Sequence, residues 1–419
     1  MSKRILSRIS IILCTTAFIA TVTAATTAPS PVATKTAPIA AAPATATPIA
    51  TPTIDPTPAP TAPSLTPTPP TLSATGYVLM DANTGMILAQ KNMNEQMHPA
   101  SLTKLMTLYL TSQALKHGQI KLTDMAPVSK NAWQTGGSRM FIKVGTEVSV
   151  QNLIDGIIVA SGNDACVALS EFVGGNEQTF VGMMNQAAAQ LGMKNTHYTD
   201  STGLPDPQHF TTPYDMALLS RAIITQFPED YVWYKQKWIT YNGIKQPNRN
   251  RLLWRDPSVD GLKTGHTEEA GYCLISSALR NGMRLIAIIL GTPTDAKRAN
   301  DSEALLNWGF RFYNTHKLFD ANQALAHPRV WLGADKTIPV GVASTLYVTI
   351  PKNTYAQLTP KITLDQNALH APIKKGAAVG TISIQMGNNV LTTAPLIALQ
   401  DDAKGNIFSR IWDHIAMIL

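Results

Sequence analysis

The sequence is poor in cysteine and lacks metal-binding motifs. Only three of its 419 residues are cysteine, and no Cys-x-x-Cys or His-Glu-x-x-His pattern occurs, so a zinc site has no support. Cys14 lies in an N-terminal apolar run without the small residues that precede a lipid-modified cysteine. An oxidising compartment would allow Cys166 and Cys273 to pair, but their apolar surroundings and the length of the chain favour two buried thiols.

Runs of lysine and arginine are also missing. The formal net charge is +7 and the isoelectric point about 9.2, yet the basic residues are spread along the chain. Nucleic acid binding is therefore not expected, and the excess positive charge suits a weak attraction to anionic surfaces of the cell envelope.

No apolar run reaches the length of a typical membrane span. The N-terminus has Lys3, Arg4 and Arg8, an apolar run over 9–20, and small residues up to Ala25. This order predicts a signal peptide over residues 1–25 and an exported protein. An uncleaved anchor is the alternative, although the apolar run is shorter than the roughly 20 residues that cross a bilayer.

Residues 26–72 have a composition that cannot form a core. They are almost entirely Ala, Thr and Pro, hold 13 of the 28 prolines, and include only two charged residues, Lys35 and Asp55. Such a segment favours extended polyproline II at about 3.1 Å per residue. We expect a linker without packed structure.

Residues 73–322 show the pattern of an α+β domain. A hairpin is expected over 77–89, and helices after Ser101, over 177–191, over 212–227 and over 294–313. The run that follows Asn163 is apolar on all sides, which predicts a helix in the middle of a core. Strand-like runs at 261–267, 272–278 and 285–290 indicate an antiparallel sheet.

The last hundred residues differ in pattern from the preceding domain, because they contain strand-like runs without long helical periods. Residues 326–401 contain strand-like runs, such as the alternation of Ile382 and Ile384 with polar neighbours, and predict a small β-rich domain. Residues 405–419 form an amphipathic helix that is too short to span a bilayer and is expected to lie on the membrane surface. The alternative is a terminal helix docked on its own domain.

A hydroxyl and an amine stand three residues apart in the segment 101–104 (SLTK). At this spacing on a helix, the amine of Lys104 can reach the oxygen of Ser101. A helix start also favours developing negative charge. The spacing is common, however, and a serine after Pro99 could equally be a helix cap.

Two further motifs make a catalytic interpretation of Ser101 and Lys104 more specific. The segment 161–163 (SGN) precedes the predicted buried helix, and the segment 263–265 (KTG) lies on a predicted strand. With these three motifs in this order, the sequence resembles the penicillin-recognising serine acyl enzymes, and among them the low-molecular-mass penicillin-binding proteins that act as D-alanyl-D-alanine carboxypeptidases. The resemblance extends from about residue 75 to the C-terminus and includes the segments 99–104, 161–166, 248–250, 260–267 and 308–311.

The resemblance implies a β-lactamase/transpeptidase-like α+β domain, with an antiparallel sheet beside a helical subdomain, followed by the β-rich domain and the amphipathic helix. It implies that Ser101 is the nucleophile and that Lys104 is its base, kept neutral by burial and by the Lys263 cation. Ser161 would pass the proton to the leaving amine. Asn163 would orient Lys104 and hold a substrate amide.

The same resemblance implies the substrate-binding residues. Lys263, Thr264 and Gly265 would form a strand edge along which the peptide lies, with the missing side chain of Gly265 allowing close approach. The backbone N–H groups of Ser101 and His266 would form the oxyanion hole. Arg298, or as a second candidate Arg249, would bind the terminal carboxylate.

We therefore expect a serine-type D-Ala-D-Ala carboxypeptidase that needs no metal or cofactor. Its substrates would be peptidoglycan stem peptides, its covalent inhibitors β-lactam antibiotics, and its location the periplasmic face of the inner membrane. A serine β-lactamase and a weakly active wall-binding scaffold are the alternatives. Residues 133–140 form a shorter segment than the loop that many members of this family carry beside the site, so the resemblance does not fix the rate of deacylation.

Overall fold

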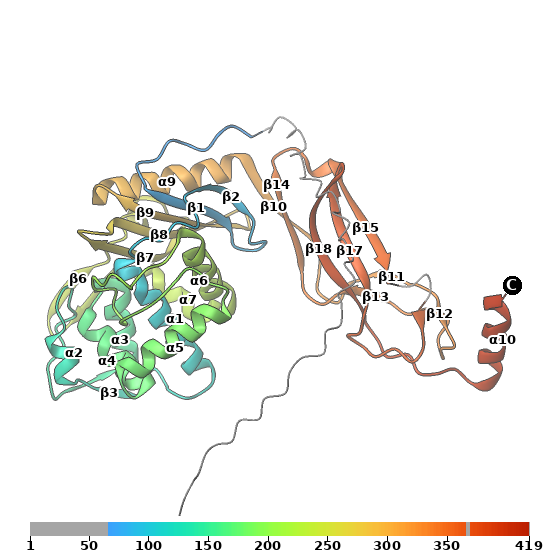
Figure 1. Cartoon of the computed structure of the whole chain (residues 1–419), viewed down its shortest axis with the longest axis horizontal. Helices are drawn as coiled ribbons and strands as arrows, with labels where there is room; N and C mark the ends of the chain where they lie inside the picture. The colour runs from blue at the N-terminus through green and yellow to red at the C-terminus, as the bar shows by residue number, and fades with distance from the viewer. Residues whose placement is uncertain (1–65, 366–368, 419) are drawn as a thin grey trace, which may run out of the picture. The chain divides into compact units, whose positions relative to one another are not determined.

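The structure is a computed structural model that describes residues 66–365 and 369–418 (Figure 1). The predicted signal peptide and most of the proline-rich linker lie outside the described residues. The domain boundaries given above remain predictions.

A five-stranded antiparallel sheet forms the centre of the first domain. Its strand order is β2-β1-β9-β8-β7. The strands are β1 (Gly76–Asp81), β2 (Ile87–Lys91), β7 (Val259–Thr267), β8 (Gly271–Arg280) and β9 (Met283–Thr292). The predicted hairpin and the three predicted strands are confirmed, and β7 is left as an edge strand.

Apolar residues on both faces of the sheet explain why helices pack against both faces. Along β9, Ile286, Ile288 and Leu290 belong to one core, whereas Leu285, Ala287 and Ile289 belong to the other, as expected from the period of two in a strand. The helix α9 (Asp295–Phe312) covers one face (Figure 1). The helical subdomain covers the other face, and its longer helices are α1 (Lys104–Lys116), α4 (Asn163–Gly174), α5 (Glu177–Gln190) and α6 (Pro213–Gln226).

The sequence patterns that predicted the helices α4 and α6 are confirmed. Every residue of α4 from Asn163 to Ser170 is buried, as its apolar composition predicted. The hydroxyl of Thr212 caps α6 by accepting a bond from the Asp215 N–H, and Pro213 follows as the first helical residue.

Shorter elements complete this domain. They are η1 (Ala100–Thr103), β3 (Met125–Pro127), α2 (Lys130–Gln134), β4 (Glu147–Ser149), α3 (Val150–Asp155), η2 (Gly156–Ala160), α7 (Pro228–Tyr231), η3 (Val232–Lys235), β5 (Trp238–Tyr241), β6 (Ile244–Pro247) and α8 (Leu252–Arg255).

The segment from Tyr313 onward is β-rich, and it includes the range 326–401 for which a β-rich domain was predicted. Its main sheet has the order β11-β13-β18-β17-β15, and two small sheets pair β10 with β14 and β12 with β16. Ile382 and Ile384 are buried in its core, in agreement with their alternation. The elements are β10 (Tyr313–Phe319), β11 (Ala324–Ala326), β12 (Val330–Trp331), β13 (Val340–Val342), β14 (Leu346–Pro351), η4 (Tyr355–Gln357), β15 (Leu358–Leu364), β16 (Leu369–His370), β17 (Ala378–Met386) and β18 (Asn389–Ala398).

The final helix, α10 (Ile407–Ile418), turns its polar side to its own domain. The carboxylate of Asp413 accepts a bond from the Leu332 N–H at 2.7 Å and lies 3.5 Å from the Arg329 guanidinium. On the other side, Phe408 and Trp412 are 81% and 74% exposed. The predicted apolar face is thus uncovered, and across residues 66–365 and 369–418 no helix has the length and hydropathy to cross a membrane.

Candidate active site

Ser101 and Lys104 lie where a short 3₁₀ turn, η1, leads into α1. In such a turn side chains three residues apart are eclipsed, and the Lys104 Nζ donates to the Ser101 Oγ at 2.8 Å. The same amine donates to the carbonyl oxygen of Thr202 at 2.7 Å. Ala100, directly before the serine, has a positive φ of 48°, an uncommon conformation for a residue with a side chain. The turn thus holds the hydroxyl and the amine together.

A second serine–lysine pair comes from the other two motifs. Lys263, on the edge strand β7, donates to the Ser161 Oγ at 2.8 Å and to the carbonyl oxygen of Thr264 at 3.0 Å. Ser161 has a left-handed φ of 57° where η2 ends and α4 is about to begin. Both lysines are buried, and each presents its amine to a serine hydroxyl.

Burial has the largest effect on the pKa values of the two lysine amines. It lowers the pKa of Lys104 to about 8, and the Arg249 charge lowers it further, against the opposing influence of Cys166, Asp200 and Asp164. Burial also lowers the pKa of Lys263 well below its usual value, and the charge of Lys104 adds to this. The coupling expected between the two lysines is thus present as a lowering of the Lys263 pKa, and Arg249 adds a second like charge that acts on Lys104.

Most of the predicted residues line one cavity of about 520 Å³. The two serines open into it, and the predicted Arg249, Thr264, Gly265, His266 and Arg298 are on its walls. Lys104 and Lys263 lie behind the serines to which they donate. Residues that the sequence analysis did not select also line it: Ser138, Pro247, Asn248, Arg251, Tyr272 and Asp295.

The position of Gly265 is crowded by the nucleophile's own turn. A Cβ atom there would lie 2.9 Å from the carbonyl oxygen of Pro99 and 3.3 Å from the Cβ of Ala100. The missing side chain of Gly265 thus lets β7 pack against this turn, and the approach of a peptide expected at this glycine stays a prediction.

Two arginines offer guanidinium groups to the cavity. Arg298 is 6% exposed and is fixed by bonds to the carbonyl oxygens of Gly265 and Cys273 and by an ion pair with Asp295. Asp295 is shared with Arg251, at 2.5 Å, so this group of three keeps one net positive charge. Arg249 donates to the Ser138 Oγ at 2.8 Å.

Asn163 bonds the loop that precedes it in the sequence. Its side-chain amide donates to the carbonyl oxygen of Gly136 at 2.7 Å, and its backbone N–H donates to the carbonyl oxygen of Ser138. Lys104 is held by the carbonyl oxygen of Thr202, and among residues 66–365 and 369–418 no hydrogen bond joins it to Asn163, so the orienting role expected of Asn163 stays a prediction. Asn163 therefore anchors the loop before it.

Two carboxylates that sequence reasoning missed shape the site. Asp164 accepts bonds from the backbone N–H groups of Met140, Phe141 and Ile142, which fastens the loop bearing Ser138. Asp200 accepts bonds from the N–H groups of Thr202 and Gly203 and so forms the turn that presents the Thr202 carbonyl. An Asp followed by Ser-Thr-Gly is a turn signature that could have indicated the second.

The two cysteines of this domain do not pair. Cys166 and Cys273 are free and buried, as their apolar context favoured, and burial raises the pKa of each thiol to about 11.

Comparison with known proteins agrees with this geometry. Residues 64–294 match the family model of D-alanyl-D-alanine carboxypeptidase, and residues 313–404 match that of the penicillin-binding protein 5 C-terminal domain. The D-alanyl-D-alanine carboxypeptidase DacC of Escherichia coli is 45% identical over 355 residues, which cover 83% of this chain and 89% of DacC.

Solved structures show the same similarity. Penicillin-binding protein 5 from Haemophilus influenzae is 41% identical with a TM-score of 0.77, covering 80% of this chain and 99% of that one. Penicillin-binding protein D2 from Listeria monocytogenes, solved in its ampicillin-bound form, is 32% identical with a TM-score of 0.53, covering 57% of this chain and 98% of that one. The chain therefore belongs to the family of serine-type D-alanyl-D-alanine carboxypeptidases, with the α+β catalytic domain and the β-rich C-terminal domain of the penicillin-binding protein 5 group.

Proposed function

We propose that the enzyme removes the terminal D-alanine from peptidoglycan stem peptides through an ester at Ser101. Neutral Lys104 accepts the hydroxyl proton as the Ser101 oxygen attacks the carbonyl carbon of the penultimate D-alanine. The amide nitrogen then leaves as free D-alanine, protonated through Ser161, and water later hydrolyses the ester. The 2.8 Å bond between Lys104 and Ser101 is the observation that carries this proposal.

We propose that substrate binding decides which lysine is charged. In the free site both lysine pKa values are lowered by burial, and that of Lys263 is lowered further by Lys104. A substrate carboxylate beside Arg298 would favour a proton on Lys263. The resulting cation would disfavour a second charge on Lys104, which would stay neutral as a base must.

The edge strand β7 supports a defined substrate path. Its outer edge has no strand partner in the described sheet, and Thr264, Gly265 and His266 line the cavity. We propose that the acyl-D-Ala-D-Ala peptide adds to this edge as a strand. The N–H groups of Ser101 and His266 then bind the oxyanion, Asn163 contacts a substrate amide, and Arg298, with Arg249 as second candidate, binds the carboxylate.

A membrane-surface location is the second part of the proposal. The apolar face of α10, with Ile407, Phe408, Ile411 and Trp412 all more than half exposed, supports insertion into the interface. The enzyme would be exported and held peripherally at the periplasmic face of the inner membrane. Two changes test this location: deletion of residues 406–419, and the substitution Trp412→Glu, for which Asp401→Asn is the control. The measurement is the partition of each variant between the membrane and soluble fractions. Unchanged partition would rule out the helix as an anchor.

One experiment tests the chemistry. Labelled penicillin and diacetyl-Lys-D-Ala-D-Ala are given to the enzyme and to Ser101→Ala, and the adduct mass and free D-alanine are followed. We expect the wild type to form the adduct and release D-alanine, and the variant to do neither. Rapid antibiotic turnover without D-alanine release would indicate a β-lactamase, and neither product would indicate a scaffold.

A further inference from the structure

A second cavity, of about 670 Å³, lies at the opposite end of the sheet from Ser101. Strand β8 connects the two, since Tyr272 lines the first cavity and Arg280 the second. Eight residues of strand at about 3.3 Å each separate these positions by roughly 26 Å. A ligand in the second cavity therefore cannot be the dipeptide that is cut at Ser101.

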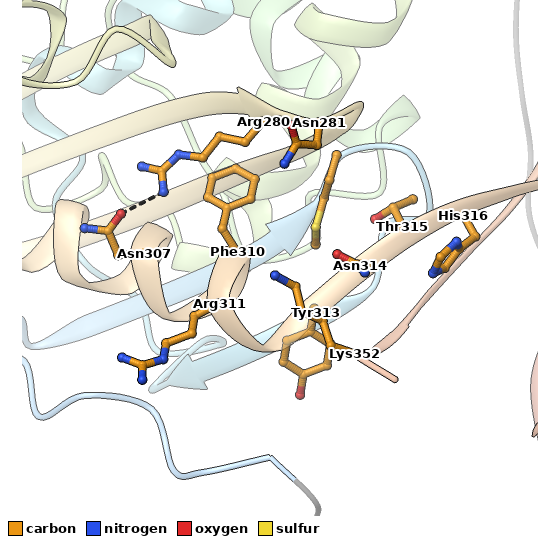
Figure 2. A pocket seen from close by; sticks show the side chains of 11 residues that line it. Arg280, Asn281, Asn307, Phe310, Arg311, Tyr313, Asn314, Thr315, His316 and Lys352 are labelled. Carbon is orange, nitrogen blue, oxygen red and sulfur yellow. Dashed lines mark hydrogen bonds between the residues drawn. The ribbon is translucent and has the colours of Figure 1, made fainter. Parts of the chain in front are cut away.

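Several elements contribute side chains to this cavity, as Figure 2 shows. Asn281 comes from the turn between β8 and β9, Arg311 from the end of α9, and Asn314 from the start of β10. Lys352 directly follows β14, and its backbone N–H donates to the carbonyl oxygen of Phe312. The cavity is thus built where the two matched family domains join.

Of the three Arg and Lys side chains that line this cavity, one has an ion-pair partner among the described residues and two do not. Arg280 is neutralised by Asp256 at 2.6 Å and also donates to Asn307. The side chains of Arg311 and Lys352, in contrast, have no hydrogen-bond or ion-pair partner within residues 66–365 and 369–418. The buried carboxylate of Asp81 lies behind Thr315, whose hydroxyl donates to it. Two cations therefore remain available to an incoming anion.

The uncharged lining favours a glycan or peptide over a lipid. The rings of Phe310 and Tyr313 and the amides of Asn281 and Asn314 line the same cavity, and the Arg280 guanidinium lies over the Phe310 ring at 4.5 Å from its centre. Rings supply flat apolar faces, and amides both donate and accept, which suits a polar polymer. The exposed aliphatic surface that a lipid needs is found instead on α10.

We propose that this second cavity binds carboxylate groups of the peptidoglycan polymer, on a stem peptide next to the one being cut. Arg311 and Lys352 would bind the carboxylate, and the amides and rings would contact the backbone to which it is attached. Occupation of both cavities would hold the polymer against the enzyme and lower the apparent KM for polymer without affecting a short peptide. This inference rests on peptidoglycan being the substrate.

The test compares a polymeric with a small substrate. The double variant Arg311→Gln/Lys352→Gln is assayed on uncrosslinked glycan strands bearing pentapeptides and on diacetyl-Lys-D-Ala-D-Ala. We expect its apparent KM for the strands to rise about fivefold or more, with kcat/KM for the small peptide within about twofold of wild type. The matched control Lys194→Gln/Lys374→Gln removes the same charge from exposed positions outside the cavity and should behave as wild type.

Direct binding separates this proposal from the enzyme's activity. In the Ser101→Ala background, sedimentation with insoluble peptidoglycan should fall on Arg311→Gln/Lys352→Gln, whereas sedimentation with anionic phospholipid vesicles should not. Three outcomes would overturn the proposal. They are an unchanged KM for the strands, an equal rise in KM or fall in peptidoglycan binding in the control variant, and a loss of vesicle binding alone. Failure of the wild type to release D-alanine would instead refute the carboxypeptidase assignment, and the sedimentation result would still test the cavity.

Discussion

The Nε2 atom of His209 lies 2.8 Å from the Oγ1 atom of Thr103, the residue directly before Lys104. The Thr103 hydroxyl gives its proton to the carbonyl oxygen of Ala100, so His209 must donate through Nε2. Its Nδ1 is then free to accept the hydroxyl of Thr199 at 3.1 Å. Burial lowers the His209 pKa, in agreement with a neutral ring that ties the turn at 199–203 to the turn at 100–103.

Removing this ring should disturb both turns. We expect His209→Leu to lower the free energy of unfolding by about 2 kcal/mol, because the buried hydroxyl of Thr103 and the partly buried hydroxyl of Thr199 lose a partner, and to lower kcat about tenfold with little change in KM. His209→Gln, which can keep one bond, should recover part of each loss. Denaturant unfolding and steady-state kinetics measure the two effects.

His197→Ala serves as the control, because within residues 66–365 and 369–418 that ring has one hydrogen bond, to the carbonyl oxygen of Gln208 at an exposed position. A His209 variant that is less stable but keeps its kcat would contradict a positioning role.

The lowered pKa of Lys104 predicts the pH dependence of acylation. The base must be unprotonated, so the second-order rate of penicillin acylation should rise about tenfold per pH unit below about 8 and level off above it. Replacing Arg249→Gln removes a charge that lowers this pKa, and the midpoint should therefore move to higher pH. Stopped-flow acylation between pH 5 and 10 measures both midpoints, and a wild-type rate that still rises tenfold per unit up to pH 10 would contradict the lowered pKa of Lys104.

Arg298 should discriminate between a free and a blocked C-terminus. A charge-assisted bond contributes roughly 1.5–3 kcal/mol, so we expect Arg298→Gln to lower kcat/KM for diacetyl-Lys-D-Ala-D-Ala about 10- to 100-fold. The same variant should have little effect on the C-terminal amide of that peptide. If Arg249→Gln alone removed the preference for the acid, the second candidate would be the carboxylate ligand.

Gly203 should tolerate no side chain. Its φ is +87°, and a Cβ would lie 1.8 Å from the carbonyl oxygen of Ala100, so Gly203→Ala must displace the backbone beside the nucleophile. We expect a variant that is poorly folded or inactive.

Gly182 provides the contrast within α5. It has open space around it, and Gly182→Ala should raise the free energy of unfolding by about 0.5–1 kcal/mol, because alanine is the better helix former. Thermal unfolding of the two variants measures the difference. Equal effects would show that the crowding at Gly203 can be relieved by the neighbouring turns.

Local patterns were enough to predict most of the elements. The strands β7, β8 and β9, the capped helix α6 and the buried helix α4 follow from periodicity, turn residues and caps, which act over a few neighbouring positions. The contact between Ser101 and Lys104 also follows from local spacing. The resemblance of three motifs then indicated that distant segments meet at this pair.

Side-chain partners across the chain could not be predicted in the same way. The side-chain amide of Asn163 bonds the carbonyl oxygen of Gly136, and the carbonyl that holds Lys104 comes from Thr202, 98 residues away. The like charge that lowers the Lys104 pKa belongs to Arg249. Each of these depends on how separately folded elements pack against one another.

The sequence by itself determined which segments become helices and strands and which residue types bring chemistry to them, because these properties depend on short-range periodicity and composition. Only the tertiary structure decided which carbonyl, carboxylate or guanidinium faces each catalytic candidate. Hydrogen bonds and buried charges act over a few ångströms, and that proximity exists only after packing brings distant residues together.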